Sequence, residues 1–220
     1  MSLLAVVASA CSPHRASQSP DARPGPVEAM KEQVLAVVAP TPGMVVAEIG
    51  VGGGWFVVRV AEAVGPNGVV YGTDISAQAL DAVRGKLPYL APGAGRVDLR
   101  LCRDDRDTAL DDLPDNHVDT VLMIDSLCFA EHPRARNVEY LRTFLRILRP
   151  GGRLVHHMDC QCGVTVDAVV ALFADAGFTA NIETLDVDPD PISVEPSWPC
   201  RSEVERARHA FVGVFRKPGG

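Results

Sequence analysis

A glycine-rich segment and a later aspartate could together bind a nucleotide-like cofactor. The segment, Glu48-Ile49-Gly50-Val51-Gly52-Gly53-Gly54, lies where a short apolar run passes into a helical pattern. Glycine is favoured at such a turn because the chain bends tightly and its backbone must approach a ligand closely. Asp74 follows the next apolar run, where a carboxylate can accept hydrogen bonds from both ribose hydroxyls. The spacing predicts a cofactor site that includes Gly50, Gly52, Gly54 and Asp74.

The same segment also indicates which cofactor binds. A dinucleotide fingerprint needs a third glycine three residues after the second, where the helix begins and the pyrophosphate is held. That position is Trp55 when counted from Gly52 and Val57 when counted from Gly54. S-adenosylmethionine has no pyrophosphate and does not require that glycine, and the acid Glu48 suits a cationic ligand better than a phosphate. We therefore expect S-adenosylmethionine, with a nicotinamide cofactor as the disfavoured alternative.

Acidic and imidazole side chains are predicted near the ends of two later strands. Asp125 closes one apolar run, and His156 and His157 lie within the run at residues 153–158. Asp125 could act as a general base or as an anchor for cofactor or substrate. We favour the anchor because displacement on the activated methyl group of S-adenosylmethionine depends mainly on positioning. Strand alternation places one histidine against each face of the sheet. His157, nearer the strand end, is the better catalytic candidate of the two, and Asp159 is another candidate there.

The six cysteines do not form a CxxC pair, so zinc-ribbon and thioredoxin-like sites lack their spacing. Four of them are predicted near the carboxyl ends of strands, namely Cys102, Cys128, Cys160 and Cys162. Thiolates converging at that edge could bind a soft metal or metalloid. Cysteines in strands more often serve as small apolar side chains. The sequence therefore predicts no metal site and keeps a thiol site as an alternative.

These residues are distributed along an alternating pattern of helices and strands. Helices are predicted at residues 27–38, 55–64, 77–86, 134–148 and 166–176 from apolar spacing and from their proline and glycine boundaries. Strands are predicted at residues 44–49, 69–73, 97–102, 118–124, 153–158, 179–187 and 210–215. Strands that alternate with helices predict a parallel sheet with helices on both faces, and two closing strands joined by a loop predict an antiparallel finish.

The composition limits the partners. The chain has 220 residues, enough for one domain, and its formal net charge of −7 argues against a nucleic-acid backbone as the main partner. Several arginines fall in the predicted helix at residues 134–148, where we interpret them as its solvated face. No internal stretch approaches the roughly 20 apolar residues of a membrane span. Nothing in the sequence indicates an oligomeric state.

The first 26 residues differ from the rest of the chain. Residues 1–10 form a short apolar run before Cys11, as at a bacterial lipoprotein cleavage site, although no Lys or Arg precedes the run. Residues 12–26 are rich in Pro, Ser, Arg and Ala without periodicity, which is typical of a disordered linker. We expect a leader or disordered tail at residues 1–26 and one domain at residues 27–220. The expected location is the cytoplasm or, if Cys11 carries a lipid anchor, the bacterial cell envelope.

Residues 27–217 resemble class I S-adenosylmethionine-dependent methyltransferases, in particular the bacterial "predicted methyltransferases", several of which carry lipoprotein-like leaders. The resemblance is carried by three strings in the family's order, VVAEIGVGGGWFVVRVAEAVGPNGVVYGTDIS, LPDNHVDTVLMIDSLCF and LRILRPGGRLVHHMD. It implies a Rossmann-like fold with a seven-stranded, mostly parallel sheet in the order 3-2-1-4-5-7-6. Helices would cover both faces of that sheet, and strand seven would be antiparallel.

The resemblance also implies roles for individual residues. Each residue would contact one part of the cofactor. The methionine moiety would be bound by Glu48, Gly50 and Gly52, and the ribose by Asp74. The face of adenine would pack on Ile75, and its amino group would bind Asp104 or Asp105. Asp125 matches a position beside the methyl group. Relatives follow that aspartate with a His-His pair where this chain has Cys128-Phe129, so the acceptor is left open.

The predicted function is transfer of a methyl group from S-adenosylmethionine to a small-molecule nucleophile by SN2 displacement. The alternatives are a cofactor-binding protein without catalysis and a thiol-based, arsenite-like metalloid methyltransferase; a nicotinamide oxidoreductase ranks behind them. The loop at residues 186–201 is a candidate cover for the acceptor site, with Trp198 as a wall. The sequence does not identify the acceptor atom, because one fold hosts many acceptors.

Overall fold

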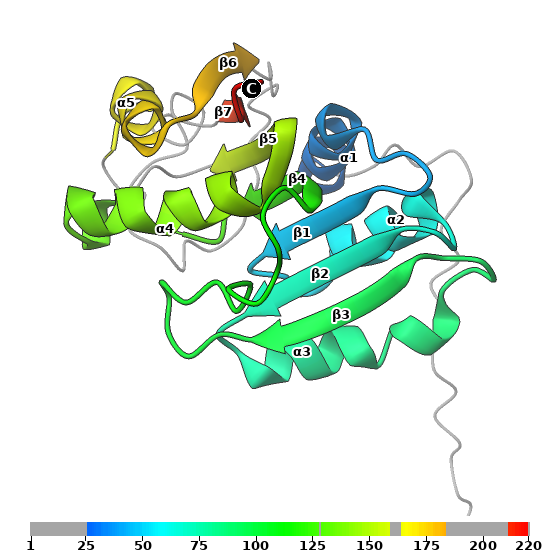
Figure 1. Ribbon diagram of the computed structural model, residues 1–220. Helices are drawn as coiled ribbons and strands as arrows, with labels where there is room; N and C mark the ends of the chain where they lie inside the picture. Colours follow the sequence, from blue (N-terminus) through cyan, green and yellow to red (C-terminus); the bar gives the residue numbers. More distant parts are fainter. Residues whose placement is uncertain (1–25, 128, 159–163, 184–210, 220) are drawn as a thin grey trace, which may run out of the picture.

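The computed structural model describes residues 26–127, 129–158, 164–183 and 211–219 (Figure 1). Seven strands form one sheet in the order β3-β2-β1-β4-β5-β7-β6. In chain order they are β1 (Val45–Ile49), β2 (Val69–Asp74), β3 (Arg96–Leu101), β4 (Val118–Ile124), β5 (Leu148–Met158), β6 (Thr179–Glu183) and β7 (Phe211–Arg216). The pairs are parallel except those of β7, which runs antiparallel to β5 and to β6. The predicted strand order and antiparallel finish are confirmed.

Helices cover both faces of this sheet, as predicted (Figure 1). One face carries α1 (Pro26–Val38), α2 (Trp55–Val64) and α3 (Ala77–Arg84), and the other carries α4 (Arg134–Ile147) and α5 (Val166–Ala176). Two short 3₁₀ helices, η1 (Leu87–Tyr89) and η2 (Phe129–Glu131), were not predicted. The sequence pattern missed them because a single turn shows no apolar periodicity.

The apolar spacing of the helices explains which face each one buries. In α2 the buried side chains recur one and four positions apart, at Phe56, Val57, Val60, Ala61 and Val64. They belong to one apolar cluster with buried residues of β1, β2 and β4. On the opposite face, α4 buries Tyr140, Leu141, Phe144 and Ile147 against the sheet and α5. Each fully buried large apolar side chain contributes about 1.5–3 kcal/mol, so the sheet is fixed from both sides.

Two helices begin and end where their capping residues predict. The Ser76 side chain accepts a hydrogen bond from the Ala79 amide at 3.2 Å and caps the start of α3. Thr165 caps α5 in the same way through the Ala168 amide at 3.3 Å. Gly177 ends α5 with a φ of 106°, a left-handed conformation that glycine adopts at little cost.

The start of β5 differs from the prediction. The strand predicted at residues 153–158 begins earlier, at Leu148, and Pro150-Gly151-Gly152 lies within β5 as an irregularity between two parts paired with β4. Gly151 has a φ of 75°, and its amide donates to the Lys217 carbonyl, while the Lys217 amide donates to Gly152. The turn sequence is therefore accommodated inside the strand because the residue after β7 supplies its hydrogen-bond partners.

The parallel strands β1 to β5 end at one edge of the sheet (Figure 1), and the candidate site residues lie in or just after those ends. In an open α/β sheet the crevice at the carboxyl ends of the strands is where ligands bind. Within the described part of the chain, no helix combines the length and the apolar character that a membrane span requires.

Candidate active site

The turn between β1 and α2 requires glycine at specific positions. Gly50, Gly52 and Gly54 have positive φ angles of 76°, 46° and 75°, which side-chain-bearing residues rarely adopt. A Cβ on Gly50 would lie 2.5 Å from Cβ of Ser126, and one on Gly54 would lie 2.6 Å from a methyl carbon of Val83. The turn is therefore packed directly against the segment that follows β4 and against α3.

Glu48, next to this turn, is a buried acid. Its side chain is 3% exposed, and its Oε2 atom has no hydrogen-bond partner among the described residues. Burial and the nearby charge of Asp74 raise the pKa of Glu48 well above its usual value, although a hydrogen bond from the Val57 backbone acts in the opposite direction. Burying a carboxylate with one oxygen unpartnered is costly, so the site is suited to a cationic ligand that would restore the ionised form.

Asp74 is the last residue of β2, and its carboxylate links the glycine turn to the residue that begins α3. Its Oδ2 atom accepts a hydrogen bond from the Gly52 amide at 2.9 Å, and its Oδ1 atom accepts one from the Ser76 amide at 2.8 Å. A carboxylate has about four lone-pair positions, so both oxygens retain capacity for ribose hydroxyls. Ile75 follows with 61% of its surface exposed, which leaves an apolar side chain available to a flat ring.

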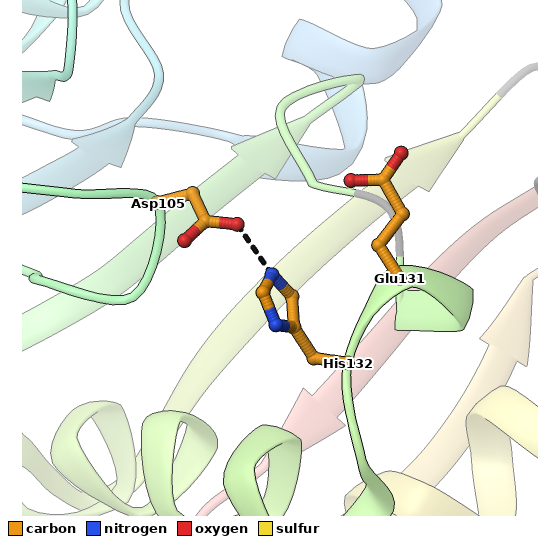
Figure 2. Close-up of side chains that lie close together, drawn as sticks. All are labelled: Asp105, Glu131 and His132. Atoms are coloured by element: carbon orange, nitrogen blue, oxygen red, sulfur yellow. Dashed lines mark hydrogen bonds and ion pairs between the residues drawn. The ribbon is translucent and has the colours of Figure 1, made fainter.

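The two aspartates after β3 have different surroundings. The strand ends at Leu101, one residue earlier than predicted, so neither Asp104 nor Asp105 is directly attached to it. Asp104 accepts hydrogen bonds from the amides of Arg106 and Asp107, which stabilises its own turn. Asp105 instead accepts from the His132 ring at 2.5 Å, across the crevice (Figure 2). The structure therefore distinguishes two residues that the sequence left equivalent.

Asp125 and His157 form a pair at the ends of β4 and β5. Oδ1 of Asp125 lies 3.1 Å from Nδ1 of His157, and the Asp125 amide donates to the His157 carbonyl at 2.9 Å. Because Ser126 touches Gly50, this pair borders the glycine turn. His157 is 1% exposed, and its Nε2 atom has no hydrogen-bond partner among the described residues. The predicted placement of both residues at one edge is confirmed, whereas their catalytic roles stay predictions.

His156 points to the opposite face, as strand alternation predicts. Its ring packs against Phe129 and Phe173, with centroids 5.5 and 5.8 Å away, and its Nδ1 atom lies 3.1 Å from the Met123 carbonyl oxygen. Burial lowers the pKa of His156 to about 4, so the ring is neutral at ordinary pH. This histidine belongs to the core.

The structure offers no support for a thiol site among the residues it describes. Cys102 is buried at the end of β3, and burial raises the pKa of its thiol, which disfavours the thiolate that binds metals. Cys128, Cys160 and Cys162 lie outside the described residues, as do Asp159, Trp198 and the expected leader with Cys11. The thiol alternative therefore remains only a sequence-based hypothesis.

Sequence reasoning did not single out Glu131 or His132, which lie at the same edge. His132 reaches Asp105 from the segment between β4 and α4, and Glu131 lies beside it (Figure 2). The available signal was their position shortly after Asp125, because the segment after β4 returns to the crevice. Their partner Asp105 lies far away in sequence, so the cluster could not be predicted without the fold.

The site combines a glycine turn after β1, an acid at the end of β2 and a polar pair at the ends of β4 and β5. Residues 46–152 match the family described as "Methyltransferase domain". This chain carries a methyltransferase domain. A comparison with curated proteins finds no significant sequence match.

Solved structures share the fold of this domain. A SAM-dependent methyltransferase from Aquifex aeolicus has a TM-score of 0.59 and 18% identity, covering 88% of this chain and 98% of that one. A second, from Methanosarcina mazei, has a TM-score of 0.58 and 13% identity, covering 84% of this chain and 98% of that one. The methyltransferase component of a complex with the Haloferax volcanii Trm112 activator has a TM-score of 0.61 and 19% identity, covering 86% and 88%.

The domain match and the fold together support a class I S-adenosylmethionine-dependent methyltransferase, with S-adenosylmethionine as the expected cofactor. The residues of the crevice fit that cofactor in three respects. The turn has room only for backbone at Gly50 and Gly54, Glu48 has a buried oxygen without a partner among the described residues, and Asp74 is followed by the exposed apolar side chain of Ile75. The matched segment includes Asp125 and ends before His157.

Proposed function

We propose that this methyltransferase acts on a small-molecule nucleophile and that Asp125 anchors the reacting groups at the end of β4. The contact between Gly50 and Ser126 carries the proposal, because it brings the residue next to Asp125 against the turn expected to bind the cofactor. A ligand that follows the turn from Asp74 toward β4 would meet Asp125 at that point. The cofactor and acceptor sites would then adjoin at the ends of β1 and β4.

Each residue of the crevice has a distinct proposed task. Asp74 would bind the ribose hydroxyls, and Ile75 would pack on the adenine face. Glu48, with its unpartnered buried oxygen, would offset the positive charge of the methionine moiety. Either Asp104 or Asp105 would bind the adenine amino group, and Asp104 is the freer candidate because Asp105 already bonds to His132.

The proposed mechanism places little chemical demand on the protein. S-adenosylmethionine, when bound, supplies a methyl group that is already activated by its sulfonium. The chain must hold the nucleophile in line with that methyl group and exclude water, and orientation alone can supply several kcal/mol of the barrier. Asp125 is held from two sides by His157, through its backbone amide and its carboxylate. We therefore assign His157 as a positioning residue for Asp125.

A small-molecule acceptor is favoured over a nucleic acid by charge. The net charge of the chain is −7, and acids lie within or just after the carboxyl ends of β1 to β4. Arginines near the crevice are engaged by carboxylates: Arg103 contacts Asp107 at 2.7 Å, and Arg106 contacts Asp105 at 3.4 Å. Nucleic-acid binding needs a basic surface whose charges are available to phosphates.

Turnover of methyl-labelled S-adenosylmethionine tests the proposal. The full chain would be incubated with separate sets of small hydroxyl, amine and thiol compounds, and with total RNA and DNA as parallel acceptors. We expect label to enter at least one small-molecule set and not the nucleic acids. Label in RNA or DNA alone would overturn the small-molecule assignment. Cofactor binding without transfer to any acceptor would instead support the alternative of a protein that binds the cofactor and does not catalyse transfer.

A further inference from the structure

Three side chains from two separate segments come together at the carboxyl edge of the sheet. Asp105 lies after β3, and Glu131 and His132 lie between β4 and α4 (Figure 2). One ligand atom from each of the three lies within 4.8 Å of the others. Strands β3 and β4 are separated in the sheet by β2 and β1, so this cluster bridges the two sides of the crevice.

We propose that Asp105, Glu131 and His132 bind one divalent first-row transition metal ion of the Mn²⁺ or Co²⁺ class. Two carboxylates and one imidazole form a mixed oxygen and nitrogen set that suits these ions, whereas Ca²⁺ and Mg²⁺ prefer oxygen ligands alone. Three protein ligands leave coordination positions for water or another small ligand. The sequence predicted no metal site, because these residues are brought together only by the fold. The proposal concerns binding and does not depend on methyl transfer.

The surroundings hold the cluster in place. Asn137 is 2% exposed and donates from its side-chain amide to the carbonyl oxygens of Phe129 and His132, at 2.8 and 3.3 Å. Its Oδ1 atom accepts from Arg106 at 3.1 Å, which ties the segment after β3 to the same helix. Such supporting hydrogen bonds orient metal ligands. The ligand-bearing segments are therefore fixed by contacts that do not use the ligand atoms of Glu131 or His132.

A polar cavity lies next to the cluster, and none of the three proposed ligands is among its lining residues. Asp104, Arg106 and Arg136 contact the cluster or its neighbours and line this cavity of about 370 Å³.

One arginine beside the cluster, Arg136, opposes metal binding. Nη1 of Arg136 lies 3.3 Å from Nδ1 of His132, so this nitrogen accepts and Nε2 carries the proton that faces Asp105. Metal binding at Nε2 requires the other tautomer, in which Nδ1 can no longer accept from Arg136. The Arg136 side chain is 46% exposed and can turn away. Removing its charge should therefore strengthen metal binding.

The test is a titration of the full chain with Mn²⁺. Binding is detected as a loss of the electron paramagnetic resonance signal of the free ion. We expect one Mn²⁺ per chain, and a weaker association by at least about tenfold in both Asp105→Asn and His132→Gln. Arg136→Gln should bind Mn²⁺ more tightly than the unmodified chain. Glu62→Gln, an exposed substitution on α2 outside the cluster, serves as the matched control and should bind as the unmodified chain does.

Circular dichroism of each variant shows whether it is folded, and His132→Ala provides a second variant at the central ligand. With Co²⁺, the visible absorption bands should be those of oxygen and nitrogen ligands, without the sulfur charge-transfer band that cysteine ligation produces. Absence of Mn²⁺ binding, or equal affinity in the unmodified chain and in folded His132→Gln and His132→Ala, would overturn the proposal. In that case the cluster is a hydrogen-bonded contact between the two segments only.

Discussion

The side chain of His157 lies 3.1 Å from that of Asp125, and the backbones of the same two residues form a second hydrogen bond at 2.9 Å. These contacts hold Asp125 at a φ of 47°, a left-handed conformation that is uncommon outside glycine, asparagine and aspartate. Backbone strain of this kind persists only where neighbouring contacts determine it. The carboxylate is therefore held at the edge by both its backbone and its side chain.

Asp125→Asn keeps the shape of this side chain and removes its charge. If Asp125 is an anchor, the substitution should weaken cofactor or acceptor binding while leaving the turnover number within about tenfold of the original. Binding is measured by calorimetry, and the turnover number by methyl transfer at saturating substrate. A fall of about 10²–10⁴-fold in turnover with unchanged affinity would show instead that Asp125 is a general base. His157→Gln should reproduce the binding defect in weaker form, because it acts only through Asp125.

Asp74→Ala should weaken S-adenosylmethionine binding by about 1.5–3 kcal/mol, the range for a lost hydrogen bond to a charged group. The substitution also removes the acceptor for the Gly52 and Ser76 amides, so part of the loss comes from a less ordered turn. Asp81→Ala on the exposed surface of α3 is the control. Calorimetry should show no binding of NAD by any of these proteins. Tight NAD binding, or unchanged affinity in Asp74→Ala, would contradict the assignment of the cofactor.

Two neighbouring glycines should respond differently to alanine. At Gly50 the left-handed conformation alone costs roughly 1–2 kcal/mol, and the added Cβ would lie 2.5 Å from that of Ser126. At Gly53 the added Cβ meets nothing within 4 Å, and φ is not positive. Gly50→Ala should therefore lower the free energy of unfolding by at least about 1–2 kcal/mol, while Gly53→Ala stays within about 0.5 kcal/mol. Urea denaturation measures both, and equal losses would show that the turn is not packed as described.

Much of the architecture was predictable because it depends on local patterns. The ranges of α2, β4 and α5 were predicted to the residue, since apolar spacing locates these elements and Gly177 marks the end of α5. The bulged start of β5 was not predictable, because the partner of Gly151 is Lys217, at the far end of the sequence. The contact between Asp105 and His132 was missed for the same reason. Local sequence signals locate the helices and strands, whereas long-range hydrogen bonds determine the conformation and contacts of irregular segments.

His156 should make the protein sensitive to acid. Burial lowers its pKa from 6.5 to about 4, so the folded state binds a proton less readily than the unfolded chain. Its contribution to stability is present above pH 6.5 and is lost as the pH falls toward 4, by up to about 3 kcal/mol. His156→Gln should lower stability near neutral pH and flatten its dependence on pH in this window. An unchanged slope in folded His156→Gln would contradict the expectation.

Glu48 should couple cofactor binding to the release of a proton. In the free protein, burial and the charge of Asp74 raise its pKa well above 4.5, so the folded state retains a proton that the unfolded chain has lost. Its contribution to stability therefore decreases as the pH rises from 4.5 through the raised value. A cationic ligand beside the unpartnered oxygen favours the ionised form. Binding of S-adenosylmethionine should then release protons and tighten as the pH rises from 4.5 toward the raised pKa.

Calorimetry in buffers of different ionisation enthalpy counts the protons released on binding. The unmodified chain should release a measurable fraction of one proton per cofactor. This fraction should fall as the pH rises through the raised pKa of Glu48, because the free protein then loses the proton by itself. Glu48→Gln has a similar shape and cannot titrate, so it should release fewer protons and bind with less dependence on pH. Glu62→Gln on the exposed face of α2 is the matched control. Equal proton release by Glu48→Gln and the unmodified chain would show that Glu48 does not sense the charge of the cofactor.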